Sequence, residues 1–333
     1  MKNSYEENMQ MNKEWSARNK TIQKLLGKEV TYKEGIDRLI EFRSQLFEQI
    51  TQIVNCYPRE AFYQMPFAGE DGYHSKTLAY SIWHIFRIED IVAHSLIQCD
   101  EQILFSKGYR EKIGCDIITT GNELKGEALA EFSKKLDVDS LYAYAKAVML
   151  STNEMLQKLD YQQMKRCFGD EDSKMPFSSH WIMHIEAMQR IKNKLCELAR
   201  KGVDPIAYCG FSCDHCFLSA WCGSCRTAYH VCSFATCMPD KKCPNAVCCQ
   251  DKNIDGCYEC EEIETCTKGF YTPENDGANA AKAQAMFIKK YGKKAFLSVH
   301  DKLHEKYDFA KTQEILGQDM WEGLALLEKT YLG

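Results

Sequence analysis

"PFSSHWIMHIEAMQRIKNKLCELARKGVDP", residues 176–205, follows a strict helical pattern and then stops abruptly. Its core-facing positions recur every three or four residues, as in a helix that buries one face. These positions are Phe177, Trp181, His184, Met188, Ile191, Leu195 and Leu198. Cations in the last turn, Gly202 and Pro205 mark the end, because Gly adopts the left-handed cap and Pro cannot continue a helix. The stretch therefore predicts a long helix with one buried face.

Three more long helices are predicted upstream of this one. Residues 36–54 form the first, and residues 75–99 form a second that is apolar over most of its circumference and therefore buried on several sides. A third begins at Asp139, which is a good N-cap, and a short helix near residues 123–136 precedes it. Four long helices with one long connection in the middle of the chain predict a four-helix bundle.

The rest of the chain divides by composition. Residues 203–272 contain thirteen cysteines, short apolar runs and no sustained period, which indicates a small domain held by metal in place of a large core. Residues 273–333 return to helical patterns, and residues 1–29 are interpreted as a polar leader. The predicted fold class is mainly α: a four-helix bundle over residues 30–202, a Cys-rich metal-stapled domain and a helical tail.

Charge and hydropathy exclude several classes of partner. The net charge is −5, and residues 201–270 hold six Lys or Arg against nine Asp or Glu, the opposite of a zinc domain that grips phosphates. No run of about 18 apolar residues predicts a transmembrane helix. The polar start lacks the apolar core of a signal peptide. We therefore expect a cytoplasmic protein with reduced thiols and without a nucleic-acid or membrane partner.

The histidines of the predicted bundle are candidate metal ligands. His180 and His184 are four residues apart, so both imidazoles lie on one helix face, and His184 occupies a core-facing position. His84 lies in the aromatic-rich middle of the second helix. The alternative interpretation is that His180 and His184 are unrelated and that His84 is a hydrogen-bonded core histidine.

A resemblance to a known superfamily bears on these histidines. Residues 30–200 resemble the DinB-like four-helix-bundle superfamily, which includes thiol-dependent S-transferases and maleylpyruvate isomerases. The match lies in "SIWHIFRIED" on the second helix and "SSHWIMHIEAMQRI" on the last. It implies that His84, His180 and His184 bind one divalent metal, zinc, nickel or iron, and leave open positions for water or substrate. Met188 stands where a further histidine often follows in that superfamily.

Glu89 is the candidate catalytic residue. It falls on the apolar stripe of the second helix, which is an unusual place for a carboxylate. Beside a metal that lowers the pKa of a bound water or thiol, it would orient a ligand histidine or act as a base. The alternative interpretation is an ion pair with Arg87 or Arg190.

The cysteines between residues 209 and 266 are predicted to be metal ligands. Repeated CxxC spacing lets a tight turn aim two thiolates at one ion, and a reducing cytoplasm disfavours disulfides. The assigned ligands are Cys209, Cys213, Cys216, Cys222, Cys225, Cys243, Cys248, Cys257, Cys260 and Cys266. The spacing pattern fits less well at Cys232, at Cys237 and at the Cys248–Cys249 doublet, so the roles of these residues stay open. Zinc is the first choice of metal, and an Fe–S cluster is the alternative.

The order of these cysteines resembles a family of small bacterial and archaeal Cys-rich domains of unknown function, over residues 207–268. That resemblance implies metal binding, with zinc as the usual metal. The spacing CxxxCxxC also occurs in radical SAM enzymes, but no α/β barrel pattern follows it here. His215 and His230 are possible replacements for cysteine ligands. A second HxxxH, His300 and His304, has charged flanks and no evident third ligand, so it predicts a solvated helix face.

Two classes of function follow. The favoured one is a metal-dependent enzyme of the thiol-dependent transferase or hydrolase type, acting on a small molecule or with a low-molecular-weight thiol. The alternative is a non-catalytic protein that binds or senses metal, interacts with a protein partner or carries an Fe–S cluster. A three-His site with a nearby base supports the first. Thirteen thiols, one more than three four-ligand sets require, support the second.

Overall fold

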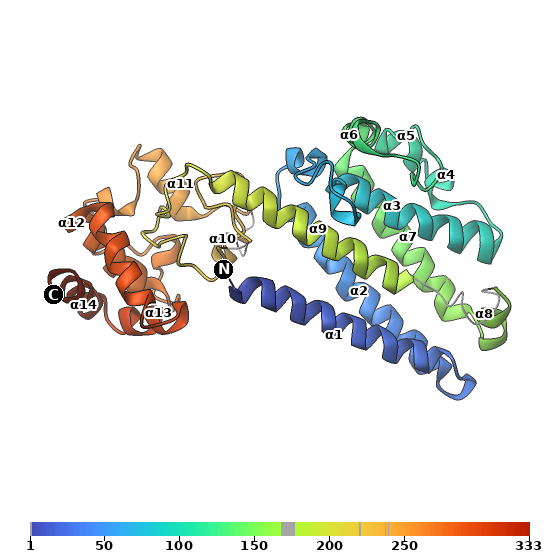
Figure 1. Cartoon of the computed structure of the whole chain (residues 1–333), viewed down its shortest axis with the longest axis horizontal. Helices are drawn as coiled ribbons and strands as arrows, with labels where there is room; N and C mark the ends of the chain where they lie inside the picture. Colours follow the sequence, from blue (N-terminus) through green and yellow to red (C-terminus); the bar gives the residue numbers. More distant parts are fainter. Residues whose placement is uncertain (1, 168–176, 220, 237, 239) are drawn as a thin grey trace. The chain divides into compact units, whose positions relative to one another are not determined.

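The computed structural model describes residues 2–167, 177–219, 221–236, 238 and 240–333. Over these residues the chain is mainly α-helical and contains no β-strand, which confirms the predicted mainly α class. No helix in this part of the chain is both long and apolar enough to cross a membrane. The chain divides into two compact units, residues 2–194 and 195–333, whose helices are labelled in Figure 1.

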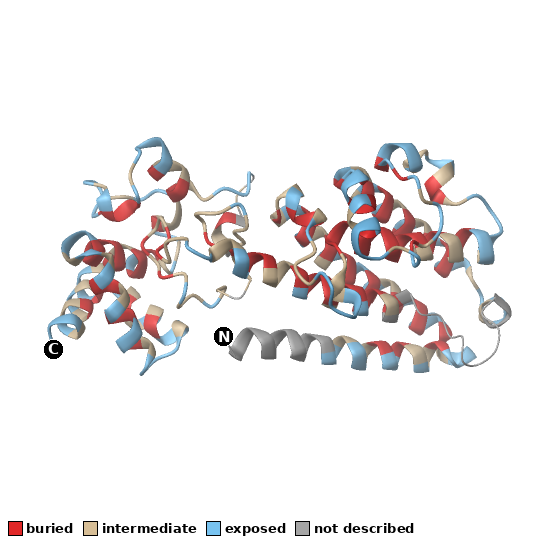
Figure 2. Ribbon diagram, turned by 45° about the horizontal axis from the view of Figure 1, so that its top comes forward, coloured by how far each residue is buried: buried red, intermediate tan, exposed pale blue. Residues whose placement is uncertain are grey.

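The four predicted long helices are all present. They are α2 (Tyr32–Cys56), α3 (Leu78–Asp90), α7 (Val138–Lys158) and α9 (Phe177–Arg200). Buried residues, red in Figure 2, cover nearly all of α3, as expected of a helix that is packed on several sides. The second predicted helix continues beyond α3 as a π-helix, Ile91–Gln98. The last one ends as expected, with Gly202 in the left-handed region at φ 77°.

The N-cap of α7 differs from the prediction. Asp137 takes this role, because its carboxylate accepts a hydrogen bond from the backbone N–H of Ser140 at 2.8 Å. The assignment to Asp139 was wrong, since this residue lies in the first turn and binds Arg59 at 2.6 Å. Asp137 satisfies one of the backbone donors that every helix start leaves without a partner, whereas a carboxylate inside the first turn interacts favourably with the helix dipole.

The segment expected to be a polar leader forms helix α1 (Lys2–Leu26), which packs along α2. Ile22 and Leu26 are buried in this contact and lie one turn apart on the same face. Gly35 of α2 permits the close approach, because a Cβ there would come within 2.9 Å of the Leu26 backbone nitrogen. The segment is polar overall, so its narrow apolar stripe was not recognised as the buried face of a helix.

The long connection between α3 and α7 is held by two buried charged side chains of α3. It contains three short helices, α4 (Ile103–Ser106), α5 (Tyr109–Ile113) and α6 (Gly126–Lys135). The Asp90 carboxylate accepts hydrogen bonds from the backbone N–H groups of Ile103 and Leu104 at 2.8 and 3.0 Å. Arg87 donates to the backbone carbonyl of Ile118 at 2.9 and 2.6 Å. Because buried charges require such partners, these bonds fix the connection to the bundle.

Arg43 of α2 and Glu89 of α3 form an ion pair inside the bundle, where both side chains are at most 1 % exposed. The Arg43 Nη1 and Nη2 atoms donate to the two carboxylate oxygens at 2.9 and 2.7 Å. The Arg43 Nε atom donates to Asn153 of α7 at 2.9 Å, and its guanidinium lies 4.7 Å from the ring centre of Trp181 on α9. One side chain of α2 therefore contacts the other three predicted helices of the bundle.

The second unit combines the Cys-rich region with the tail. Short helices α10 (Ser233–Thr236) and α11 (Pro244–Asp251) lie in the Cys-rich region. The tail consists of α12 (Ala278–His304), α13 (Phe309–Gly317) and α14 (Met320–Leu332). Gly292 divides α12 into two halves, because its φ of 82° and ψ of 165° are not helical.

The Cys-rich region and the tail share one hydrophobic core. Tyr258, Ile263 and Tyr271 are buried in the same cluster as Phe287 and Phe296 of α12. Gly210 permits close contact, because its φ is 92° and a Cβ there would lie 3.0 Å from Ala285 of α12. The Cys-rich region supplies few large apolar side chains of its own, so the tail provides the surface on which it packs.

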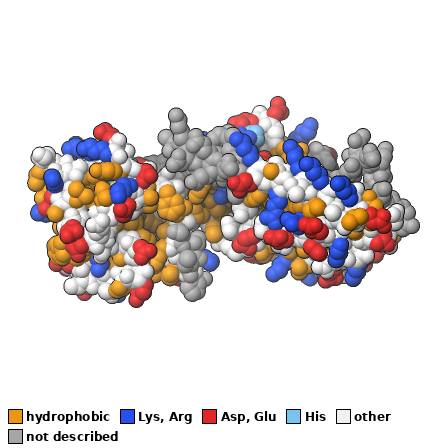
Figure 3. Space-filling model, turned by 90° about the horizontal axis from the view of Figure 1, so that it is seen from below, with side chains coloured by type: hydrophobic (Ala, Val, Ile, Leu, Met, Phe, Trp, Pro, Cys, Tyr) orange, Lys and Arg blue, Asp and Glu red, His pale blue; other side chains and the backbone are white. Residues whose placement is uncertain are grey.

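Charged side chains of both signs are interspersed on the surface seen in Figure 3. Several form exposed ion pairs, such as Lys33 with Asp37 at 3.6 Å and Arg38 with Glu34 at 2.8 Å. Pairs of this kind contribute little to stability, so the buried pair of Arg43 and Glu89 is the better target for a stability test.

We expect Glu89→Gln to destabilise the first unit by about 3–5 kcal/mol, because it leaves the Arg43 charge buried without its counterion. Denaturant unfolding of the full chain, followed by circular dichroism, measures this effect. Asp37→Asn is the matched control and should change stability by at most about 0.5 kcal/mol, since its partner Lys33 is exposed. Equal stability of the two variants would contradict a central role for the buried pair.

Candidate metal centres

Three histidines from two helices converge in the first unit. His84 of α3 lies with its ring centre 5.3 Å from that of His180 and 4.9 Å from that of His184, both on α9. The ring centres of His180 and His184 are 4.6 Å apart. One ligand nitrogen from each lies within 4.8 Å of the others, which is close enough to share one metal ion. We call these residues the bundle triad, and the structure brings the three predicted ligands together.

His84 is oriented by the long connection. Its Nδ1 atom donates a hydrogen bond to the Thr120 backbone carbonyl at 2.7 Å, which leaves Nε2 available for a metal. Tyr80 stacks on the imidazole with 5.4 Å between ring centres and donates from its hydroxyl to the Gly121 carbonyl at 2.9 Å. The segment that Arg87 holds at Ile118 therefore also fixes the ring of His84.

His184 is 1 % exposed, and neither of its ring nitrogens has a hydrogen-bond partner among the described residues. The ring of Tyr73 contacts it edge-on, with 4.9 Å between the ring centres. A buried polar atom without a partner costs roughly 1–3 kcal/mol, and this cost is removed when the nitrogen coordinates a metal. The unpartnered nitrogens therefore fit a metal ligand better than a core histidine.

Burial keeps the bundle triad in the neutral form. Desolvation, together with the neighbouring imidazoles, lowers the pKa of His184 to about 2. The same causes lower the pKa of His180 to about 4. Desolvation also lowers the pKa of His84, although its bond to the Thr120 carbonyl opposes the shift. Neutral imidazole is the form that binds metal, so no proton has to leave before coordination.

Glu89 does not join the bundle triad. It follows His84 by five residues, a rotation of about 140° around an α-helix, so it points to a different side of α3. Both of its carboxylate oxygens accept hydrogen bonds from Arg43. The expected partner Arg87 instead binds Ile118, and Arg190 contacts His74 at 3.1 Å. An ion pair was among the expectations for Glu89, but its partner comes from α2.

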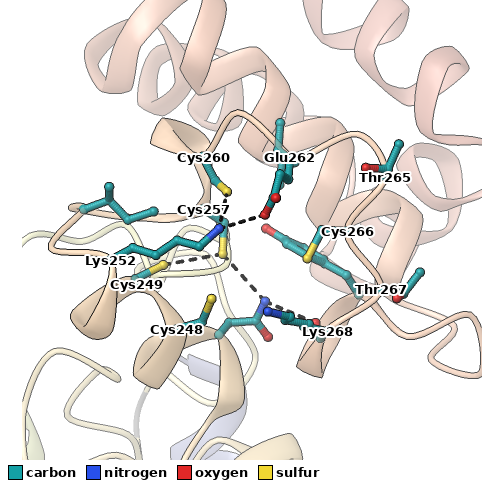
Figure 4. A pocket seen from close by; sticks show the side chains of 14 residues that line it. Cys248, Cys249, Lys252, Cys257, Cys260, Glu262, Thr265, Cys266, Thr267 and Lys268 are labelled. Atoms are coloured by element: carbon teal, nitrogen blue, oxygen red, sulfur yellow. Dashed lines mark hydrogen bonds and ion pairs between the residues drawn. The ribbon is translucent and has the colours of Figure 1, made fainter.

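The described cysteines between residues 209 and 266 line two separate cavities. Figure 4 shows the first, the five-thiol cavity, which contains Cys248, Cys249, Cys257, Cys260 and Cys266. The second, the seven-thiol cavity, contains Cys209, Cys213, Cys216, Cys222, Cys225, Cys232 and Cys243. All ten predicted ligands line one cavity or the other, as do Cys232 and Cys249, whose roles were open. Cys237 lies outside the described residues.

Local contacts favour thiolate ligands in both cavities. In the five-thiol cavity the sulfurs of Cys249 and Cys257 are 3.6 Å apart, and Lys252 donates to Cys260 at 3.4 Å. In the seven-thiol cavity the backbone N–H groups of Tyr208 and Val231 point at the sulfurs of Cys225 and Cys222. Among the described residues, however, no three cysteine sulfurs lie as close together as the nitrogens of the bundle triad.

Burial also affects the thiols. Desolvation raises the pKa of Cys213 to about 11 and that of Cys216 to about 12. Hydrogen bonds from Cys249 and Asn245 instead lower the pKa of Cys257. Because a metal binds thiolate and not thiol, metal binding in the seven-thiol cavity must release protons.

A second group of histidines was not predicted. His215 of the Cys-rich region lies with His300 and His304 of α12, with ligand nitrogens again within 4.8 Å of one another. The expectation of a solvated HxxxH was wrong for His300, which is 1 % exposed. The i, i+4 spacing was visible in the sequence, but its third member lies 85 residues upstream of His300 and only the shared core brings it close.

Comparison with known proteins adds no assignment to this geometry. No family model matches the chain, and no curated protein matches its sequence.

Removal of metal with a chelator should expose residues 207–268 to limited proteolysis and leave the bundle intact. Helices are short in this region, so bound metal is expected to hold its loops. Mass spectrometry of the fragments identifies the cleavage sites. Cys213→Ser combined with Cys225→Ser should reproduce the effect without chelator, whereas Cys99→Ser, at an exposed position outside both cavities, should not. Unchanged cleavage after complete metal removal would contradict a stapling role.

Proposed function

We propose that this chain is a metalloprotein whose bundle triad holds one divalent metal, and that it belongs with the DinB-like superfamily that its sequence resembles. The observation that carries the proposal is the convergence of three neutral imidazoles, one of them buried with both nitrogens unpartnered in the described structure. Three imidazoles suit zinc, nickel or iron(II).

The chain's own residues would prepare such a centre. The Thr120 carbonyl holds His84 in one tautomer, and burial excludes water from His184. His180 is the more accessible member of the bundle triad. A metal with an open position would lower the pKa of a bound water or thiol and make it a nucleophile near neutral pH.

We infer an enzyme of the thiol-dependent transferase or hydrolase type, acting on a small electrophile. Glu89 is not assigned as its base, because Arg43 engages both carboxylate oxygens. The cysteines of the second unit would bind zinc as structural staples, as the resemblance over residues 207–268 implies.

A second candidate function rests on a different observation. The two thiol cavities hold twelve described cysteines, and Cys248, Cys249, Cys257, Cys260 and Cys266 make one more than a four-ligand site requires. A protein that stores, senses or hands on metal, or that carries an Fe–S cluster, would have such an excess. Absorption near 400 nm from brown, anaerobically purified protein would favour an Fe–S cluster. Colourless protein that contains zinc would favour structural zinc sites.

The bundle site is tested by His84→Asn. The Asn side-chain amide retains a donor toward the Thr120 carbonyl but removes Nε2, so the variant should fold while losing one metal ion per chain. Elemental analysis of full-length protein measures the loss, and circular dichroism checks the fold. His94→Asn is the matched control, because His94 is also buried but binds Asp100 and Ser151. An unchanged metal content in His84→Asn would contradict the bundle site.

Activation of a thiol is tested with cobalt(II) in place of the native metal. Addition of a small thiol should produce a new thiolate-to-cobalt charge-transfer band in the wild type and in His94→Asn but not in His84→Asn. The difference spectrum removes the constant contribution of the cysteine sites. The same new band in His84→Asn would show that the thiol binds elsewhere and would contradict the transferase proposal.

A further inference from the structure

His215, His300 and His304, here called the second triad, meet in the second unit. His300 and His304 are one turn apart on the half of α12 that follows Gly292, and His215 comes from the loop between Cys213 and Cys216. The ring centre of His215 lies 5.5 Å from that of His300 and 4.5 Å from that of His304. We propose that the second triad is a metal site of its own, made of histidines, that ties the Cys-rich loop to α12.

Three of the four imidazole nitrogens that α12 brings to this site are buried without a hydrogen-bond partner among the described residues. His300 is 1 % exposed, and neither of its nitrogens has a hydrogen-bond partner among the described residues; the same is true of Nε2 of His304. Ring stacking alone does not compensate for buried polar nitrogens, since it leaves their lone pairs and N–H groups unsatisfied. A coordinated cation would satisfy them, and the helix already presents them at the i, i+4 spacing of metal-binding histidines.

His215 is held in place by two polar neighbours. Its Nδ1 atom lies 2.8 Å from the Ser212 hydroxyl, and its Nε2 atom lies 3.1 Å from the carboxylate of Asp301. On metal binding one nitrogen exchanges its present partner for the ion, while the other keeps a hydrogen bond that fixes the ring. A carboxylate or hydroxyl that orients a ligand histidine is the usual arrangement around protein-bound zinc.

The ligand set selects the class of cation. Three neutral imidazoles suit zinc, cobalt(II), nickel or copper(II), whereas calcium and magnesium require mainly oxygen ligands. Asp301 follows His300 directly and is largely exposed, so it or a water molecule is available as a fourth ligand. Because three side chains come from two segments 85 positions apart, the bound ion acts as a cross-link within the second unit.

The second triad is tested by cobalt(II) loading of the reduced full-length chain after metal removal. His304→Gln changes a half-buried residue near the end of α12, so the fold should persist, and His300→Gln with His304→Gln removes both helical ligands. His230→Gln is the matched control in the same unit, because among the described residues the His230 ring contacts the backbone carbonyls of Thr227 and Lys241 and lines neither thiol cavity. Bound cobalt is counted by elemental analysis and characterised by its absorption spectrum.

We expect His304→Gln and the double variant to bind one cobalt fewer than the wild type, with the thiolate-to-cobalt charge-transfer bands unchanged. His230→Gln should bind as much as the wild type. Adding His84→Asn to these variants should remove one further cobalt ion per chain if the bundle triad also binds metal. If it removes none, the bundle site is contradicted and the second triad is not. Wild-type cobalt content in His304→Gln and the double variant would overturn the second site. Loss of charge-transfer intensity together with the ion would overturn its all-histidine ligand set.

Discussion

The guanidinium of Arg43 is the group on which the arrangement of the bundle depends. It binds both carboxylate oxygens of Glu89 on α3, the side-chain amide of Asn153 on α7 and the face of Trp181 on α9, while belonging to α2 itself. A buried cation tolerates few alternative packings, because any displacement leaves charge without a counterion. This interaction therefore sets the register of the helices that carry the histidines, and it explains why Glu89 lies on an apolar stripe.

The bundle triad depends on a second layer of support that starts at the end of α3. Asp90 and Arg87 hold the long connection, and that connection presents the Thr120 carbonyl to His84. The buried charges of Arg87 and Asp90, whose role is structural, thus position the imidazole of His84, whose Nε2 is available to coordinate a metal. The same burial lowers the pKa of His184 and keeps its nitrogens free of other partners in the described structure.

In the second unit, the Cys-rich region depends on a hydrophobic core that it shares with the tail. The Cys-rich region has short helices and few large apolar residues, and it packs on α12 through Tyr258, Ile263 and Tyr271. Its cysteines separate into two cavities, which CxxC spacing does not reveal, because spacing describes neighbours along the chain and not neighbours in space. The second triad follows from the same packing, since the shared core brings the His215 loop onto the face of α12 that carries His300 and His304.

Periodicity was sufficient to predict the four long helices, the end of α9 near Gly202 and the common face of His180 and His184, because these features depend on residues at most a few turns apart. The DinB-like assignment stays a prediction that rests on resemblance. Folding was required to pair Glu89 with Arg43, to bury His300 and to bring His215 beside it. These contacts join side chains separated by tens of residues, and a local pattern carries no information about which distant side chain will satisfy a buried charge or an unpartnered nitrogen.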